Sequence, residues 1–244
     1  MSSEILTTFT KHQFSGSNGV NLPYRLFNSE TEQLKPLVLF LHGSGERGMD
    51  NELPLTANDS VPTIYEYARD VEDAVILVPQ APMADLIGAW VFDDVAESLM
   101  ELIDEVVQSY PIDENRIYIT GLSNGGAGVL NLLVQKPGRF AGAVCICGYI
   151  HGEANDIRVL PREITTSEAK KIGTTPIWLF HAEDDDVVLV ENSQQVVAAL
   201  HDFGNDHVRY TEYPTGTVQY PHCSWDNAFD NQELLPWLFS QKLN

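Results

Sequence analysis

The chain has 244 residues, and its 14 Lys and Arg stand against 35 Asp and Glu, so the formal net charge is −21. Such an acid excess argues against nucleic acid or an anionic membrane surface as a partner, because both would repel the protein. With 43% hydrophobic residues, a chain of this length is expected to fold without disulfide or metal cross-links.

Short β-rich runs alternate with helical patterns along the chain, and no repeat, low-complexity tract or linker divides it. The predicted strands are 21–27, 37–42, 74–79, 116–120, 140–147, 176–181 and 208–213. The predicted helices are 93–110, 127–136, 191–203 and about 231–241. Apolar strands that alternate with helices predict an α/β fold with a mostly parallel sheet, and we expect one domain, 1–244.

Two details of these elements can be tested, namely where one helix begins and what two long excursions form. Apolar residues spaced by three and four mark the helix at 93–110, and Asp93 or Asp94 is its expected N-cap. Two excursions, about 43–70 and about 149–174, do not fit the alternation, and long excursions at such positions often shape a substrate pocket.

The N-terminus and the cysteines bear on localisation. Residues 1–14 show no basic head followed by an apolar run, so we expect no secretory signal, and no stretch approaches the ~20 apolar residues of a membrane helix. The three cysteines form no Cys-x-x-Cys pair, so we expect no metal site and a reduced, cytoplasmic protein. Cys145 and Cys147 lie two apart in an apolar run, which predicts that both face the same side of a strand.

The strongest motif follows the predicted strand at 116–120. Gly121-Leu122-Ser123-Asn124-Gly125 has the pattern Gly-x-Ser-x-Gly, and it stands between a strand and a helix. A serine in this turn sits in strained backbone geometry, and side chains two positions away on either side would collide, which explains the glycines. The segment predicts Ser123 as a nucleophile, and a glycine-rich turn without chemistry is the alternative.

A nucleophilic serine needs a base, and the base needs a carboxylate that orients it. In this strand-turn-helix context the acid and then the histidine follow the serine along the chain. Four consecutive acids, Glu183 to Asp186, come directly after the predicted strand at 176–181, where ligands bind in open α/β sheets. We expect one of them to orient the base, and the others to be solvated loop charges.

His222 is the expected base among the seven histidines. It follows the last predicted strand after a loop that contains proline and glycine, and it precedes the last predicted helix. The other histidines that we considered are less suitable. His12 precedes the predicted sheet, His201 lies within a helix, and His42 and His181 end strands, where they are expected as packed structural groups.

Several blocks of sequence resemble the predicted esterase/phospholipase-type members of the α/β-hydrolase superfamily. These blocks are LVLFLHGSGERG, VPQAP, DENRIYITGLSNGGAG, PIWLFHAEDDDVV and HCSW, and the match runs from about residue 20 to the C-terminus. Dienelactone-hydrolase-like and polyhydroxybutyrate-depolymerase-like esterases are nearby groups. The resemblance implies an α/β-hydrolase fold, a single three-layer domain with about eight strands. It also implies a serine carboxylic-ester hydrolase without a cofactor.

The resemblance also implies site residues. Ser123 matches the nucleophile, and His222 matches the base, although Pro221 stands where a glycine is common. The acid of the family motif His-Gly-x-x-Asp falls on Asp185. Ala182 replaces the glycine of that motif, and the flanking Asp184 and Asp186 stay open as alternatives.

The resemblance further implies an oxyanion hole. Its donors would be the N–H of Asn124 and the N–H of Ser44, with Gly45 as second choice. Members of the family often carry Met after the serine, so Asn124 should alter the lining of the pocket rather than the chemistry. Glu46 and Arg47 match a Gly-Glu-Arg-Gly block, for which we expect a local ion pair that fixes the loop.

Trp90 and Trp225 are expected to line the acyl or alcohol pocket, with core packing as the alternative for each. The substrate is expected to be a small, neutral ester of short to medium acyl length, since an acidic rim at 183–186 disfavours anions. Alternative functions are a peptidase of the prolyl-oligopeptidase type, although the chain has no room for its propeller, and a deacetylase or feruloyl-type esterase on decorated sugars. A binding protein on a hydrolase scaffold is the alternative from another class.

Overall fold

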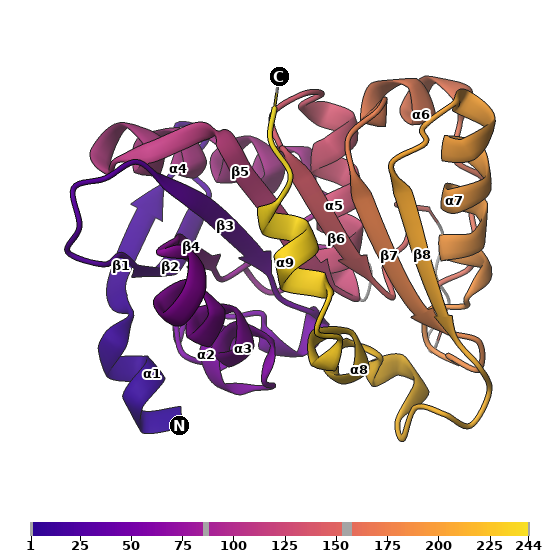
Figure 1. Ribbon diagram of the computed structural model, residues 1–244, viewed down its shortest axis with the longest axis horizontal. Helices are drawn as coiled ribbons and strands as arrows, with labels where there is room; N and C mark the ends of the chain where they lie inside the picture. Colours follow the sequence, from indigo (N-terminus) through magenta and orange to yellow (C-terminus); the bar gives the residue numbers. More distant parts are fainter. Residues whose placement is uncertain (1, 85–87, 153–157, 244) are drawn as a thin grey trace.

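The structure is a computed structural model that describes residues 2–84, 88–152 and 158–243. Within these residues, eight strands form one sheet in the order β1-β2-β4-β3-β5-β6-β7-β8 (Figure 1). The strands are β1 Thr10–Ser15, β2 Asn21–Phe27, β3 Lys35–Leu41, β4 Val75–Pro79, β5 Ile112–Leu122, β6 Gly142–Ile146, β7 Ile177–Ala182 and β8 Val208–Tyr213. The pairs β1–β2 and β2–β4 are antiparallel, and the other neighbouring pairs are parallel.

Two layers of helices cover the sheet (Figure 1). The helices are α1 Ser2–Thr8, α2 Leu53–Thr56, α3 Ser60–Tyr67, α4 Asp93–Ser109, α5 Asn124–Gln135, α6 Thr166–Ile172, α7 Glu191–Phe203, α8 Trp225–Asp230 and α9 Leu234–Phe239, with short turns η1 Ser44–Glu46, η2 Ala68–Glu72 and η3 Pro221–Cys223. Apolar residues of α4 to α7 belong to one buried cluster, and those of α1, α2, α3, α8 and α9 belong to another.

The central strand β3 shows why the sequence folds in this way. All seven of its residues are buried. Side chains alternate between the two faces of a strand, so a strand covered on both sides needs apolar residues at successive positions. Leu37 and Leu39 pack under α4 to α7, whereas Val38 and Phe40 pack under the other helical layer. The prediction of an α/β fold with three layers and a mostly parallel sheet of about eight strands is confirmed.

The first strand differs from the sequence-based expectation. The prediction that His12 precedes the sheet is wrong, because His12 lies in β1 and pairs with Tyr24 of β2. Their rings stack with a centroid distance of 4.8 Å. β1 is an edge strand in which Phe14 alone is buried. It therefore lacks the apolar run that a search for periodicity detects.

The start of α4 also differs in detail. The helix begins at Asp93, but its N-cap residue is Phe92, which makes no capping hydrogen bond from its side chain. The prediction of Asp93 or Asp94 as N-cap is therefore wrong. Both aspartates lie in the first turn instead, where their negative charge interacts favourably with the positive end of the helix dipole.

Cys145 and Cys147 face opposite sides of the sheet, so the prediction that they share a side is wrong. Cys145 packs in the cluster under α4 to α7, and Cys147 packs in the cluster of the other face. The strand β6 ends at Ile146, and Cys147 has a φ of 39°, in the left-handed region. This turn of the backbone reverses the side-chain direction that the alternation of a continued strand would give.

The two excursions contain helices of their own. Residues 43–70 fold into η1, α2 and α3, and the excursion at 149–174 contains α6. The part of that excursion at 153–157 lies outside the described residues. A helix that we did not predict, α8, links η3 to α9. In the described part of the chain, no helix combines the length and apolar character that crossing a membrane requires.

Candidate active site

Three predicted site residues meet at the carboxyl edge of the parallel strands. Ser123 follows β5, Asp185 comes shortly after β7, and His222 lies in η3 after β8. Since parallel strands end at the same edge of a sheet, residues far apart in sequence are brought together there. The topology thus explains why side chains from three separate loops form one site.

The turn at Ser123 joins β5 directly to α5. Ser123 has φ 53° and ψ −117°, a conformation that costs energy for a residue with a side chain. A Cβ on Gly121 would lie 2.5 Å from the carbonyl oxygen of Gly125, and a Cβ on Gly125 would lie 1.9 Å from that of Leu41. Both glycines are therefore required by close backbone approach, as the motif predicts.

A continuous chain of hydrogen bonds links the three side chains. The Oγ of Ser123 lies 3.0 Å from Nε2 of His222, and Nδ1 of His222 lies 2.8 Å from Oδ2 of Asp185. Ser123 is 8% exposed, His222 is half-buried, and the Asp185 side chain is fully buried. This geometry is the one that activation of a serine by a histidine and a carboxylate requires.

The four acids after β7 have different surroundings. Asp185 contacts His222, whereas Asp184 accepts a hydrogen bond from the N–H of Gly216 through Oδ2. Glu183 accepts hydrogen bonds from the N–H and hydroxyl of Thr215. Asp186 is exposed. The structure therefore brings Asp185, and neither of the flanking aspartates, against the imidazole of His222.

Asp185 is held as a carboxylate by several donors. Its Oδ1 accepts from the N–H groups of Val187 and Val188 at 2.9 and 3.0 Å, and Nε2 of His181 lies 3.3 Å from Oδ2. Burial raises the pKa of the Asp185 carboxyl. The hydrogen bonds and charge interactions with His181 and His222 together outweigh burial and hold the pKa well below its usual range.

The loop that follows β3 carries the second expected oxyanion donor. The N–H of Ala81 donates to Nε2 of His42, so Nδ1 carries the ring proton, and it donates to the carbonyl of Gly43 at 2.7 Å. A trans peptide directs its C=O and N–H to opposite sides. The N–H of Ser44 is therefore directed away from His42. Asn124 is the first residue of α5, where a backbone N–H has no acceptor within the helix.

We expect His42 to make the protein less stable in acid. Burial lowers the pKa of His42 from 6.5 to about 4. Between these values the unfolded chain binds a proton that the folded chain does not, so the free energy of unfolding falls by about 3 kcal/mol from pH 6.5 to pH 4. Urea unfolding across this range would measure the fall. In the His42→Gln variant the pH dependence should be shallower by this amount, and an unchanged slope would contradict the assignment.

The residues after Ser44 fix the loop mainly through the backbone. Arg47 donates from Nε to the carbonyl of Ser44 and from Nη1 to that of Ala84. The carboxylate of Glu46 lies 3.9 Å from Nδ1 of His42. Gln80, which none of the motifs above includes as a site residue, donates to the carbonyl of Glu46 at 2.8 Å and is fully buried. In the sequence, Gln80 can be recognised as the polar residue of the VPQAP block, directly after a buried strand.

The two tryptophans differ in their surroundings. Trp90 is 1% exposed, packs in the core and donates from Nε1 to the carbonyl of His42. This burial favours core packing for Trp90, the alternative to a substrate contact. Trp225 is half-buried, and its ring lies edge-on to that of His222 with a centroid distance of 5.6 Å.

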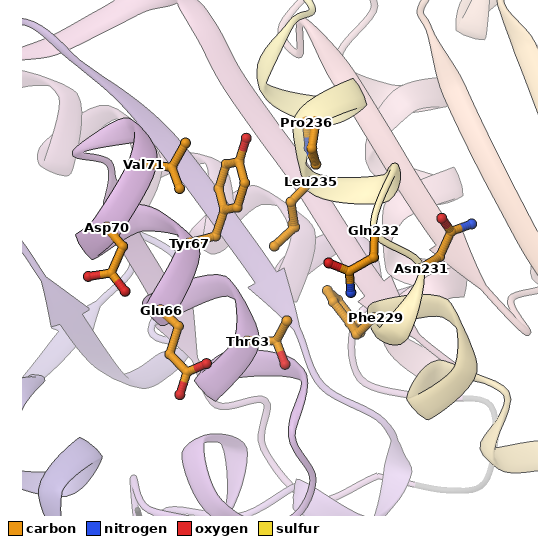
Figure 2. Close-up of a pocket in the computed structure, with 10 residues that line it drawn as sticks. All are labelled: Thr63, Glu66, Tyr67, Asp70, Val71, Phe229, Asn231, Gln232, Leu235 and Pro236. Atoms are coloured by element: carbon orange, nitrogen blue, oxygen red, sulfur yellow. The ribbon is translucent and has the colours of Figure 1, made fainter.

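A groove of about 470 Å³ lies away from these residues, between α3 and the pair α8 and α9. Figure 2 shows that Tyr67 of α3 and Leu235 of α9 point toward it, with Phe229 of α8 nearby. None of the three hydrogen-bonded side chains of the candidate site lines the groove. We therefore treat the groove as separate from the site.

Comparisons with known proteins agree with this architecture. The family model of Phospholipase/Carboxylesterase matches residues 86–226, more than half of the chain. Carboxylesterase SOBER1 of Arabidopsis thaliana is 26% identical, over 70% of this chain and 78% of that protein. The bifunctional acetylxylan esterase/xylanase XynS20E of Neocallimastix patriciarum is 25% identical, over 79% of this chain and 25% of that protein.

Among solved structures, a thermostable esterase superimposes with a TM-score of 0.84 and 36% identity, over 98% of this chain. The present chain spans 64% of that esterase and a quarter of the bifunctional enzyme. The family match confirms the resemblance inferred from the sequence blocks. The chain belongs to the phospholipase/carboxylesterase family of α/β-hydrolases.

Proposed function

We propose that the protein is a serine esterase that cleaves carboxylic esters through an acyl-enzyme. Ser123 is the nucleophile, His222 the general base and Asp185 the acid that orients it. The observation that carries this proposal is the chain of hydrogen bonds from Ser123 through His222 to Asp185, at a strained turn between strand and helix. Membership of the phospholipase/carboxylesterase family supports it.

The reaction follows from the positions of the protons. Nε2 of His222 takes the proton of Ser123 as Oγ attacks the ester carbonyl carbon, while Asp185 holds the Nδ1–H tautomer and stabilises the imidazolium. When the tetrahedral intermediate collapses, His222 gives this proton to the leaving alcohol. Water that His222 deprotonates then attacks the acyl-enzyme, and the acid product leaves with Ser123 restored.

The negative charge that develops on the carbonyl oxygen needs oriented donors. We assign them to the N–H of Asn124 and the N–H of Ser44, with Gly45 as second candidate for the latter. The first lies at the N-terminus of α5, where the helix dipole favours negative charge. The orientation of the Gly43–Ser44 peptide by His42 supports the second. Such preorganised donors are typically the largest electrostatic term in catalysis.

Trp225 is the aromatic residue that we assign to substrate contact, because its ring packs against that of His222 and is only half-buried. The alcohol portion of an ester that leaves next to His222 would meet this ring. A second candidate function, deacetylation of decorated sugars, is favoured by the acetylxylan esterase activity in the name of one relative.

The charge around the site favours neutral substrates. Asp186 and Asp226 lie at the surface near the base, and the carboxylate of Glu46 lies on the loop after β3. Partial burial and the neighbouring Asp59 and Asp230 raise the pKa of Asp226, which indicates a crowded negative rim. An anionic substrate would be repelled by this field, whereas a neutral ester would not.

A substrate panel tests the proposal and its charge selectivity together. We expect 4-nitrophenyl butyrate to be hydrolysed far faster than peptide 4-nitroanilides. A matched ester whose acyl chain ends in a carboxylate should have a kcat/KM roughly 10-fold lower at low salt, and the gap should narrow in 0.5 M NaCl as screening increases. Acetylated xylan in the same panel addresses the second candidate. Preference for the anionic ester would contradict the charge argument, and preference for anilides would contradict the esterase proposal.

A further inference from the structure

His181 is a fully buried histidine that the proposed mechanism does not use. It lies in β7, four residues before Asp185, and its side chain is 0% exposed. Both of its ring nitrogens have polar partners. Nδ1 lies 2.7 Å from Oγ of Ser193 in α7, and Nε2 lies 2.8 Å from the carbonyl oxygen of Val188. These contacts tie the ring to the loop after β7 and to the helix that follows that loop.

The partners of the ring determine which nitrogen carries the proton. A carbonyl oxygen can only accept, so Nε2 of His181 is protonated and donates to Val188. Ser193 is 1% exposed, and among the described residues its hydroxyl has no hydrogen-bond partner other than Nδ1. Buried polar groups are nearly always hydrogen-bonded, because leaving them unpaired is costly. Ser193 therefore donates to Nδ1, and the ring of His181 is the neutral Nε2–H tautomer.

The Nε2–H edge of His181 also faces the proposed acid of the site. Nε2 lies 3.3 Å from Oδ2 of Asp185, which is the oxygen that accepts from Nδ1 of His222. The carbonyl that His181 binds belongs to Val188, and the N–H of Val188 donates to Oδ1 of the same carboxylate. His181 thus contacts Asp185 directly and also fixes one of the donors that hold it.

We propose that His181 is a positioning residue of the esterase, which keeps Asp185 directed at His222 and offsets part of its negative charge. This inference rests on the proposed esterase function. Ser193 acts one step further away, because it fixes the tautomer that presents the Nε2–H. A carboxylate that faces a second N–H attracts the imidazolium of His222 less strongly, so the base loses its proton at a lower pH. The pair therefore widens the pH range in which His222 can accept the proton of Ser123.

The ionisation of Asp185 agrees with this arrangement. Burial raises the pKa of its carboxyl, but the contact with His181 and the hydrogen bond from His222 lower it, and the resulting pKa is well below the ordinary value. Asp185 is therefore a carboxylate at every pH at which the enzyme is expected to work. A change at His181 acts on a group whose charge is constant over that range.

Other titratable groups lie around Asp185 and His222 and are the same in all the variants below. They are Cys147 after β6, Cys223 of η3, Glu46 of η1, Asp226 of α8, and the neighbouring Asp184 and Asp186. Burial raises the pKa of both thiols, so these are uncharged at neutral pH. The carboxylates influence the pH profile of every variant alike, so a difference between variants reports the change at His181 or Ser193.

The test measures kcat/KM for 4-nitrophenyl butyrate from about pH 5 to about pH 9, a range that includes the acid limb set by protonation of the base. His181→Leu removes both ring nitrogens, whereas His181→Gln keeps an N–H donor near the position of Nε2. We expect the acid limb to move to higher pH by about one unit in His181→Leu and to stay in place in His181→Gln. Ser193→Ala should move it in the same direction by about half a unit. His201→Gln, at an exposed position of α7, is the control and should keep the profile.

A histidine that only fills space would give a different result. Loss of packing would lower kcat without moving the acid limb, so an unmoved limb in folded His181→Leu or Ser193→Ala would overturn the inference and leave the esterase proposal intact. Equal shifts in His181→Leu and His181→Gln would also overturn it. Circular dichroism over the same pH range shows which variants are folded. Absence of ester hydrolysis by the unmodified protein would overturn both proposals.

A second measurement needs no variant that alters the site. ¹⁵N NMR of the unmodified protein at neutral pH should show the ring of His181 protonated at Nε2 alone. This result would support the inference even if His181→Leu does not fold. A proton at Nδ1, or at both nitrogens, would overturn it, because the neutral Nε2–H tautomer would then not be the form that faces Asp185.

Discussion

Replacement of Ser123 by alanine is expected to lower kcat for ester hydrolysis by about 10⁵-fold while the protein stays folded. The change removes the Oγ that attacks the carbonyl and leaves the N–H groups that bind the oxyanion. The backbone at φ 53° is equally strained for serine and alanine, and His222 is the described partner of the lost hydroxyl. The free energy of unfolding should therefore change by no more than about 1 kcal/mol.

Two measurements separate this loss of chemistry from loss of structure. Steady-state hydrolysis of 4-nitrophenyl butyrate gives the fall in kcat, and thermal unfolding shows that the variant is folded. A fluorophosphonate probe should label the unmodified protein once, at Ser123, and should not label the variant. Ser240→Ala, at the end of α9, is the matched control and should keep both activity and labelling. A Ser123→Ala protein with nearly full activity would refute the assignment of the nucleophile.

Sequence patterns predicted the strands that carry continuous apolar runs, and also the edge strand β8, whose sequence VRYTEY alternates although none of its residues is buried. β2 and β8 have the predicted bounds, and α7 does as well. β1 was missed because its sequence, TKHQFS, has neither an apolar run nor a regular alternation of apolar and polar residues. The reversal at Cys147 was missed because a positive φ in a non-glycine residue leaves no mark in hydrophobic periodicity.

Some features of the candidate site could be predicted from local sequence, and others depend on the tertiary structure. The turn at Ser123 is local, and its glycines are needed by contacts that the motif itself encodes. Local sequence does not decide which of the four acids at 183–186 contacts His222. This contact depends on how the loop after β7 folds, since the N–H groups of Val187 and Val188 bind Oδ1 of Asp185 and direct Oδ2 toward His222. Tyr149 reaches Asn124 only because β5 and β6 are neighbours, which sequence alone did not show.

Three matched variants at Asp184, Asp185 and Asp186 test which acid orients His222. Asp185→Asn is expected to lower kcat by roughly 10³- to 10⁴-fold, because the amide cannot stabilise the imidazolium and no longer selects the Nδ1–H tautomer. Asp184→Asn and Asp186→Asn should change kcat by no more than about threefold, since Asp184 accepts a hydrogen bond from Gly216 rather than from His222, and Asp186 is exposed, where charges interact weakly. A loss for either flanking variant as large as that for Asp185→Asn would refute the assignment of the acid.

Asp185→Asn should also lower stability, and the sign of the pH dependence identifies the cause. The folded protein holds the pKa of Asp185 below the ordinary 3.8, so this carboxylate stabilises the fold above about pH 3.8 and loses its contribution as the pH falls further. The variant should therefore be less stable than the unmodified protein at neutral pH, and the difference should shrink in acid. Urea unfolding at pH 7 and pH 3 measures this change. ¹⁵N NMR of the His222 ring in the folded variant would then show directly whether the proton has moved from Nδ1 to Nε2, where it would face Ser123 and block its activation.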